Sequence, residues 1–279
     1  MDVLAAIHQR VSVRSYADRP VEPALLERLL RFGDAADHLT DVQPRLALIS
    51  GTEQVQHILT FMVGSYGLVY NAPHLLVGVL QEESDEARVD LGYVLEQVVL
   101  EATRLGLGTC WITGTYDPER AANAVKLRSN EVAAAVCALG YPTEQTLGRL
   151  HTKAIRRLAG GQRRKPLTNI VFSGRWGLRW SPEDADPTLV TMLDHARLAP
   201  SARNAQPWRF VVQAEGVVLT LTRPSFVDAG IVMSHLTLAS ATLEHAGSWR
   251  LRLRDEALAR ECDLPRGVIP VATFEHFDG

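Results

Sequence analysis

Two long segments of the sequence repeat each other, and this repetition limits the fold more than any other feature of the chain. DLGYVLEQVVLEATRLGLGTCW (90–111) aligns without a gap on DAGIVMSHLTLASATLEHAGSW (228–249). Both segments begin with Asp, carry Gly two residues later, are apolar on more than one helical face for about five turns, and end in Trp. A helix that is apolar on several faces is buried on several sides. The sequence therefore predicts two related units, each built around one buried helix.

Shorter matches upstream extend the repetition. RVSVR (10–14) resembles RWGLR (175–179) at an offset of 165 residues, and VQP (42–44) resembles AQP (205–207) at an offset of 163. The long segments are offset by only 138 residues. The first unit must therefore hold extra residues between its QP loop and its long helix, around positions 51–84.

Short runs of β-branched residues bounded by turn formers predict strands, and helices fill the intervals. The predicted strands are 45–50, 74–80, 131–139, 209–212, 217–222 and 268–274. Paired glycines and a proline in AGGQRRKPLTN (159–169) mark a linker. We expect an α+β chain of two fused repeats, residues 1–166 and 167–279, with central sheets flanked by helices. Their buried helices would pair as in a homodimer and form an intramolecular pseudodimer. One long core helix within a single domain is the alternative.

The balance of charge and the cysteines exclude several classes of partner. The formal net charge is −3 and the pI about 6.3, so no overall positive field attracts nucleic acid. The 3 widely spaced cysteines fit reduced core thiols better than a disulfide framework or a zinc site, and no histidine pair has metal-site spacing. The N-terminal segment is no signal peptide, and polar residues interrupt each apolar helix before the ~18 residues that a membrane span needs. We therefore expect a cytoplasmic protein with a small-molecule partner.

Positive charge is concentrated in two places. Arg10, Ser12 and Arg14 alternate along an extended stretch and so share one face, where two guanidinium groups and a hydroxyl can hold a phosphate. A solvated edge strand explains the same alternation. The second concentration lies within 153–165 and consists of Lys153, Arg156, Arg157, Arg163, Arg164 and Lys165. Such a cluster needs an anion, which could be acidic residues across a surface, non-specific nucleic acid or a bound phosphate. The paired glycines before Arg163 favour a backbone that bends closely around a ligand.

The segment APSARNAQPW (199–208) ends one predicted helix and begins a strand, which a proline-serine turn can do without any ligand. Together with four other segments, however, it resembles the motif set of the FMN-dependent nitroreductase family. The segments that carry this resemblance are RVSVRSY, LGLGTCWI, ALGYP, RRKPL and LAPSARNAQPWRF. Their order resembles the fused, pseudodimeric branch of that family, known from thermophilic bacteria and mycobacterial relatives. The resemblance spans nearly the entire chain.

The resemblance implies an FMN-dependent nitroreductase-like fold that holds one flavin between the repeats. The residues that would contact FMN are Arg10, Ser12, Arg14, Thr113, Gly114, Arg163, Arg164, Pro200, Ser201 and Asn204. The arginines and Ser12 would hold the phosphate, with Arg14 nearer the N1–C2=O edge of the ring, while the proline-serine loop would contact the ring from the opposite repeat. Gln206 and Trp208 would brace that loop. No side chain is expected to act as nucleophile, base or metal ligand, because the flavin carries the chemistry.

Only one complete site is expected. A reciprocal site would combine Arg175, Gly177 and Arg179 with Ala36, Asp37 and Thr40. It lacks the serine and the basic tail, and it offers the anion Asp37 where a neutral contact belongs. We therefore expect one working site and one relic.

The activity implied by the resemblance is that of an oxidoreductase. NAD(P)H would reduce FMN, and an electron-poor acceptor such as a nitroaromatic, quinone or enone would take the hydride. Two alternatives stay open: a protein that holds FMN without turnover, with 51–73 as a lid, or a cofactor-free binding protein of the same fold. Because fusion satisfies the usual dimer interface within one chain, we expect a monomer.

Overall fold

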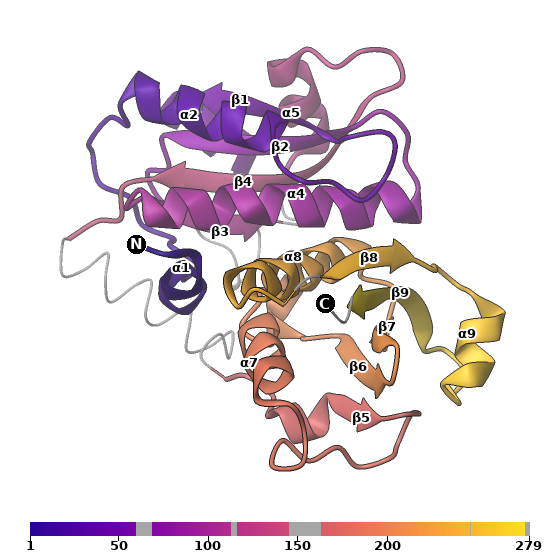
Figure 1. Cartoon of the computed structure of the whole chain (residues 1–279). Coiled ribbons are helices and arrows are strands. Elements are labelled where there is room, and N and C mark those ends of the chain that lie inside the picture. Colours follow the sequence, from indigo (N-terminus) through magenta and orange to yellow (C-terminus); the bar gives the residue numbers. More distant parts are fainter. Residues whose placement is uncertain (60–68, 113–115, 145–162, 246, 277–279) are drawn as a thin grey trace.

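The computed structural model describes residues 1–59, 69–112, 116–144, 163–245 and 247–276 (Figure 1). The elements of the first repeat are α1 (Val3–Gln9), α2 (Pro23–Asp34), β1 (Arg45–Ser50), α3 (Thr52–Leu59), β2 (His74–Leu80), α4 (Asp85–Arg104), β3 (Gly108–Ile112), α5 (Pro118–Val125) and β4 (Val132–Gly140). Those of the second repeat are η1 (Leu167–Asn169), β5 (Val171–Ser173), α7 (Pro187–Ala196), η2 (Ala202–Asn204), β6 (Trp208–Gln213), β7 (Gly216–Leu221), α8 (Phe226–Thr242), β8 (Gly247–Leu251), α9 (Glu256–Glu261) and β9 (Ile269–His276).

Two sheets of matching topology form the centres of the two repeats (Figure 1). The first has the strand order β1-β2-β4-β3, and the second has the order β6-β7-β9-β8 with β5 added in parallel on the β6 edge. All the other strand pairs are antiparallel. The helices follow the same order, since α2, α4 and α5 correspond to α7, α8 and α9. The predicted α+β chain of two fused repeats is confirmed.

The burial of the central strands follows from helices on both faces of each sheet. Strand β2, HLLVGVL, is buried at every position, because one face packs against α3 and α5 and the other against α2 and α4. A strand covered on both faces is apolar throughout rather than alternating. Side-chain caps fix the helix starts locally: Ser84 Oγ accepts from Ala87 N at 3.1 Å at the start of α4, and Asp117 Oδ1 accepts from Arg120 N at 3.0 Å at the start of α5.

The repeats pack together through α4 and α8, and two glycines set the distance between these helices (Figure 1). A Cβ on Gly92 would lie 2.1 Å from the carbonyl oxygen of Val227, and a Cβ on Gly230 would lie 1.8 Å from that of Val89. Only glycine lets two backbones approach so closely. The two glycines are equivalent in the aligned segments, and the two valines stand directly before those segments at the same offset, so the contact is symmetric. The helix pairing is that of an intramolecular pseudodimer.

The extra residues of the first repeat lie between β1 and β2, as the offsets predict. Helix α3 occupies this interval, whereas β6 and β7 are joined by a tight turn at residues 214–215. The segment 51–73, considered as a lid, includes α3, and its residues 60–68 lie outside the described residues. The linker is described only from residue 163 onward, so the boundary between residues 166 and 167 stays a prediction.

The sequence patterns do not predict β3, β5 and β8. Both long helices end before their aligned segments do, α4 at Arg104 and α8 at Thr242, so each Trp lies in the strand that follows its helix. Gly106, with φ of 79°, ends the helical path, and the β-prone TCWI that follows pairs with β4. The cysteines are buried and free, as predicted. In the part of the chain described, no helix combines the length and apolar character needed to cross a bilayer.

Candidate functional site

The arginine-serine motif forms an additional edge beside β3. Arg10 ends α1, and the chain then runs parallel to β3, with Val13 N donating to Thr109 O at 2.8 Å and Ser12 paired with Thr109. Val13 is buried. Alternation therefore turns Ser12 and Arg14 to the face opposite Val13.

Arg10 and Arg14 each have a buried Nε atom that finds no hydrogen-bond acceptor among the described residues. The Arg10 side chain is 5% exposed, and its Nε lies 3.9 Å from Oε1 of Glu96. Within the described residues, neither Nε of Arg10 nor Nε of Arg14 has a hydrogen-bond partner, although both atoms are buried. Proteins pair nearly all buried polar atoms, so these two nitrogens fit an anionic group.

The environment of Cys110 on β3 includes the arginine-serine motif. Burial raises the pKa of the Cys110 thiol, while the charges of Arg14 and Arg10 and a hydrogen bond with Ser12 oppose that shift. Thr113 and Gly114, which follow β3, lie outside the described residues.

The loop at 199–208 begins with the buried Pro200 and is strained. Three of its residues have positive φ: Arg203 at 54°, Asn204 at 52° and Gln206 at 48°. Such conformations cost of order 1 kcal/mol each for residues other than glycine. Two bonds hold the loop: Gln206 N donates to Ser201 Oγ at 2.9 Å, and Ala202 N donates to Asp228 Oδ1 at 3.0 Å. Strain of this kind is typical of segments that present groups to a ligand.

The basic tail that follows the first sheet lies on this loop of the second repeat. Arg164 Nη1 donates to Asn204 Oδ1 at 2.5 Å, and Arg164 Nη2 donates to Leu198 O at 3.0 Å. In return, Asn204 Nδ2 donates to Arg163 O at 2.9 Å. The structure thus brings Arg163 and Arg164 together with the proline-serine loop.

Further contacts between tail and loop come from Lys165 and Gln206. Lys165 N donates to Gln206 Oε1 at 2.8 Å, and Lys165 Nζ donates to Ala205 O and Gln206 O at 3.0 Å. Burial lowers the pKa of Lys165, as do the nearby charges of Arg209 and Arg223. Gln206 therefore braces the loop, as the sequence predicts, and Lys165 does so as well.

Helix α1, which precedes the arginine-serine motif, packs against α7 (Figure 1). The ring of His8, two residues before Arg10, lies with its centroid 4.9 Å from that of His195 in α7. Arg164 donates to the carbonyl of Leu198, three residues beyond His195. The end of α7 thus lies beside α1, which leads into the arginine-serine motif, and beside the tail.

The proposed match between 10–14 and 175–179 is wrong as a structural equivalence. Ser12 lies beside β3, whereas Arg179 pairs with Phe172 of β5, at the edge of the second sheet away from β8, the counterpart of β3. The chain enters the second sheet at the β6 edge directly after the tail, so this segment cannot reach β8. Arg175 instead forms an ion pair with Asp263 at 3.4 Å.

The other residues of the reciprocal set are held by α4. Thr40 Oγ1 donates to Asp90 Oδ2 at 2.6 Å, and the carbonyl of Asp37 accepts from Gln97 Nε2 at 2.9 Å. Ala36 belongs to the core cluster around α4. The contacts of the described residues therefore do not gather the reciprocal set around one point.

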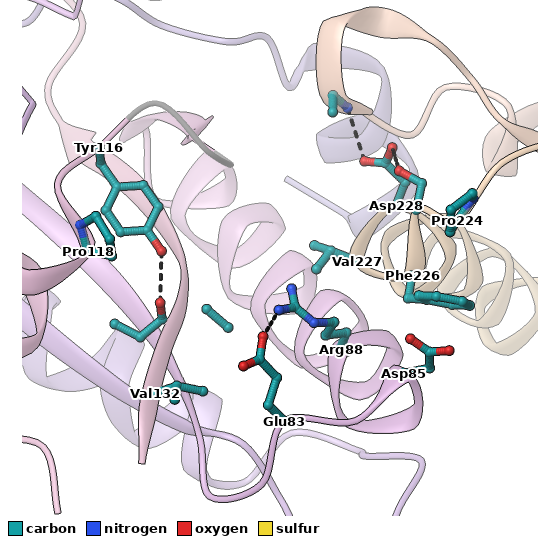
Figure 2. Close-up of a pocket in the computed structure, with 14 residues that line it drawn as sticks. Glu83, Asp85, Arg88, Tyr116, Pro118, Val132, Pro224, Phe226, Val227 and Asp228 are labelled. Atoms are coloured by element: carbon teal, nitrogen blue, oxygen red, sulfur yellow. Dashed lines mark hydrogen bonds and ion pairs between the residues drawn. The ribbon is translucent and has the colours of Figure 1, made fainter. Parts of the chain in front are cut away.

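A cavity of about 690 Å³ lies between the repeats next to the loop (Figure 2). The first repeat lines it with the starts of α4 and α5 and with β4, and the second lines it with Ala202 and the start of α8. Figure 2 shows Tyr116 on one side and Phe226 with Asp228 on the other. Tyr116 Oη donates to Ala133 O at 2.8 Å, and burial raises the pKa of Tyr116. The cavity offers both apolar and polar surface to a small molecule beside the predicted ring-binding loop.

Sequence reasoning missed the aspartates that hold the loops. Asp228 accepts from Ala202 N and from Ser225 Oγ, and burial raises the pKa of Asp228. Asp90, its equivalent in α4, accepts from Leu39 N at 2.7 Å. The shared Asp at the start of the aligned segments is the signal that could have identified this role. Among the described residues, no group of His, Cys, Asp and Glu could hold a metal ion.

Comparisons with known proteins bear on this architecture. The family model described as "Putative TM nitroreductase" matches residues 2–240. A "Putative NADH dehydrogenase/NAD(P)H nitroreductase" of Methanothermobacter thermautotrophicus is 28% identical over 154 residues, which are 52% of this chain and 79% of the relative. The crystal structure of a "putative nitroreductase" of Thermotoga maritima matches 90% of each chain at 21% identity with a TM-score of 0.59. An FMN-dependent nitroreductase of Clostridium difficile matches 50% of this chain and 88% of its own at 22% identity, with a TM-score of 0.45. Because the family match runs from α1 into α8 and so includes both helices that pair the repeats, this chain belongs to the TM nitroreductase family.

Proposed function

We propose that this chain, as a monomer, binds one FMN between its repeats and catalyses hydride transfer from NAD(P)H to an electron-poor acceptor such as a nitroaromatic, quinone or enone. The observation that carries the proposal is the pair of buried Nε atoms on Arg10 and Arg14, which lack a partner among the described residues. A phosphate supplies the acceptors that two such guanidinium groups need. The curated NAD(P)H-linked relative supports the choice of electron donor.

Each repeat would contribute part of the binding site. The phosphate would be held by Arg10, Ser12, Arg163 and Arg164, and the ring by Arg14, Pro200, Ser201 and Asn204. The backbone of Thr113 and Gly114 is assigned to the ring edge by the family resemblance alone. The chemistry that bound FMN supplies is acceptance of a hydride from the nicotinamide and its donation to the acceptor.

The contacts that the site residues make with one another support these proposed roles. Arg164 and Asn204 already hold each other, so little ordering of the loop is left to oppose binding. Arg10 is almost fully buried, and a charge in low-dielectric surroundings attracts an anion more strongly than a charge in water. Arg14 would place a fixed positive charge where the reduced ring carries negative charge. The cavity beside Ala202 gives a small acceptor a place next to the loop.

The absorbance spectrum of the purified protein with added FMN tests the proposal directly. A bound flavin spectrum that bleaches with NADH or NADPH under nitrogen is the expected result. A flavin that stays oxidised with both nicotinamides would favour the FMN-holding alternative. A protein that takes up no FMN would refute the flavin site and favour the cofactor-free alternative.

Substitution of Arg10 tests the assignment of residues. Arg10→Ala should weaken FMN binding about ten- to hundredfold, since a hydrogen bond to a charged group contributes about 1.5–3 kcal/mol. Arg179→Ala is the control, because Arg179 is exposed at β5. The dissociation constants can be measured by quenching of flavin fluorescence. An equal loss in both variants would show that the site is assigned to the wrong residues.

A further inference from the structure

A buried polar cluster lies directly behind Arg10 and joins the two repeats. Glu96 of α4 accepts from Trp111 Nε1 at 2.6 Å through Oε2, and its Oε1 lies 2.8 Å from Nε2 of His235 in α8. Glu96 and His235 are both fully buried. The cluster therefore consists of one carboxyl group, one imidazole and the guanidinium of Arg10, with a tryptophan as an added donor.

The hydrogen bonds of His235 fix the net charge of its pair with Glu96. Nδ1 of His235 lies 3.2 Å from the carbonyl oxygen of His195, which can only accept, so Nδ1 carries a proton. A second proton lies between Nε2 of His235 and Oε1 of Glu96. The pair is neutral whichever of these two atoms carries that proton, as imidazolium with carboxylate or as imidazole with carboxylic acid.

Among the residues that the structure describes, no carboxylate therefore fully compensates the charge of Arg10, although Glu96 is close. Nε of Arg10 lies 3.9 Å from Oε1 of Glu96, which is too long for a hydrogen bond, and both Glu96 oxygens make shorter bonds elsewhere. A buried cation without a neutralising partner is costly and favours the binding of an anion. If His235 did not share its second proton with Glu96, the carboxylate of Glu96 would be free to neutralise Arg10.

We infer that His235 is a positioning residue for a phosphate at Arg10: His235 of the second repeat occupies the carboxylate of Glu96, which would otherwise compete for Arg10, so that Arg10 of the first repeat stays available to the phosphate. The inference rests on the proposed function only where it takes this phosphate to be that of FMN. Because Glu96 and His235 stand on α4 and α8, phosphate binding by the first repeat depends on its pairing with the second.

A double-mutant cycle in the full chain tests this inference. The variants His235→Gln, Glu96→Gln and the double variant are titrated with FMN and with inorganic phosphate. His235→Gln keeps an N–H for Glu96 but removes the positive charge, so the carboxylate neutralises Arg10 and affinity falls about tenfold or more. Glu96→Gln removes the competing carboxylate, so affinity stays within about threefold of that of the unaltered chain. The double variant should regain the affinity that His235→Gln loses.

Glu101→Gln is the matched control. Glu101 is a buried carboxylate of the same helix, but its partners are Arg28 at 2.6 Å and Arg104 at 2.8 Å. This variant should lose stability without losing affinity. If the cluster were merely structural, both single variants would bind weakly and the double variant most weakly, and that result overturns the inference. Should His235→Gln not fold, Glu96→Gln still decides, since a tenfold loss of affinity in Glu96→Gln would contradict the charge argument.

Two probes separate this inference from the proposed function. FMN binding is followed by quenching of flavin fluorescence, and phosphate binding by the rise in Tm that a ligand of the folded state produces. If phosphate binds with the expected dependence on His235 but FMN does not bind, the proposed function fails and the inference stands. If FMN binds equally well to the His235→Gln variant, the inference fails and the function stands. Failure of the unaltered chain to bind either probe refutes both.

Discussion

Replacement of Gly230 by alanine should force the two repeats apart, because no side chain fits between α4 and α8. The added Cβ would lie 1.8 Å from Val89 O and 2.6 Å from Tyr93 N. Both are backbone atoms of α4 and cannot rotate aside as a side chain can. Normal contacts require α8 to move away from α4 by at least about 1 Å.

The effect on stability follows from this movement. Overpacking a core typically costs about 1–3 kcal/mol, and a clash with backbone belongs at the upper end because packing is lost along the whole helix pair. Alanine returns about 1 kcal/mol through its higher helix propensity. We expect a net loss of about 2 kcal/mol in the free energy of unfolding. Gly92→Ala should cost a similar amount, and the double variant less than the sum, because the first shift already makes room for the second Cβ.

Denaturant unfolding measures this loss, with Gly33→Ala as the control. Gly33 also lies in a helix, α2, but a Cβ there would meet side-chain atoms of Leu46 and Val98, which can rotate. Glu96 and His235 follow the two glycines by about one turn, so Gly230→Ala should also weaken phosphate binding, whereas Gly33→Ala should not. If Gly230→Ala were as stable as Gly33→Ala, the close crossing of α4 and α8 would be refuted.

The remaining predictions concern single carboxylates. Hydrogen bonds from Arg45 and the backbone of Arg128 hold the pKa of Glu131 at about 2, below its ordinary 4.5. Because the value in the folded state is the lower one, this contribution to stability is present above pH 4.5 and is lost as the pH falls toward 2. Denaturant titration should show Glu131→Gln less stable than the unaltered chain near pH 7, with a smaller difference near pH 3; equal differences contradict the linkage. Asp228→Ala should weaken FMN binding, since it releases the amide of Ala202 in the proline-serine loop. Asp90→Ala is the control, because Asp90 holds the loop of the other repeat. An equal loss of affinity in both variants would indicate general destabilisation.

Much of the fold can be predicted from the repeat, because the residues that recur are those that make the fold's contacts. The shared glycines, Gly92 and Gly230, permit the helix crossing, and the aspartates two residues earlier hold the loops. Strands β3 and β8 escape prediction, since they follow the helices after only a short turn and gain strand structure by pairing with β4 and β9. Strand β5 has 3 residues and depends on the edge that β6 offers.

The sequence predicts the residues that line the candidate site, but it does not predict the buried residues that support them. Alternation in the sequence places Arg10, Ser12 and Arg14 on one face, and composition marks the basic tail. The match to 175–179 fails because five residues with two arginines carry little information about position in a sheet. The pairing of Glu96 with His235 spans 139 residues and depends on the helix crossing. The sequence signal for this pairing is Glu96 itself, a charged residue in a helix that is apolar on several faces, because a buried charge needs a partner.

The symmetry of the two repeats bears on the role that we infer for Glu96 and His235. The position equivalent to Glu96 in α8 is Ser234, and the position equivalent to His235 in α4 is Gln97, so neither of the corresponding positions carries an ionisable side chain. The two helices pack together both where Glu96 and His235 stand and where Ser234 and Gln97 stand, so their pairing does not need ionisable residues. Buried ion pairs contribute little to stability compared with apolar packing. The ionisable pair lies on the side where Arg10 lies, and this is the asymmetry expected from the single phosphate site that we propose between two otherwise similar repeats.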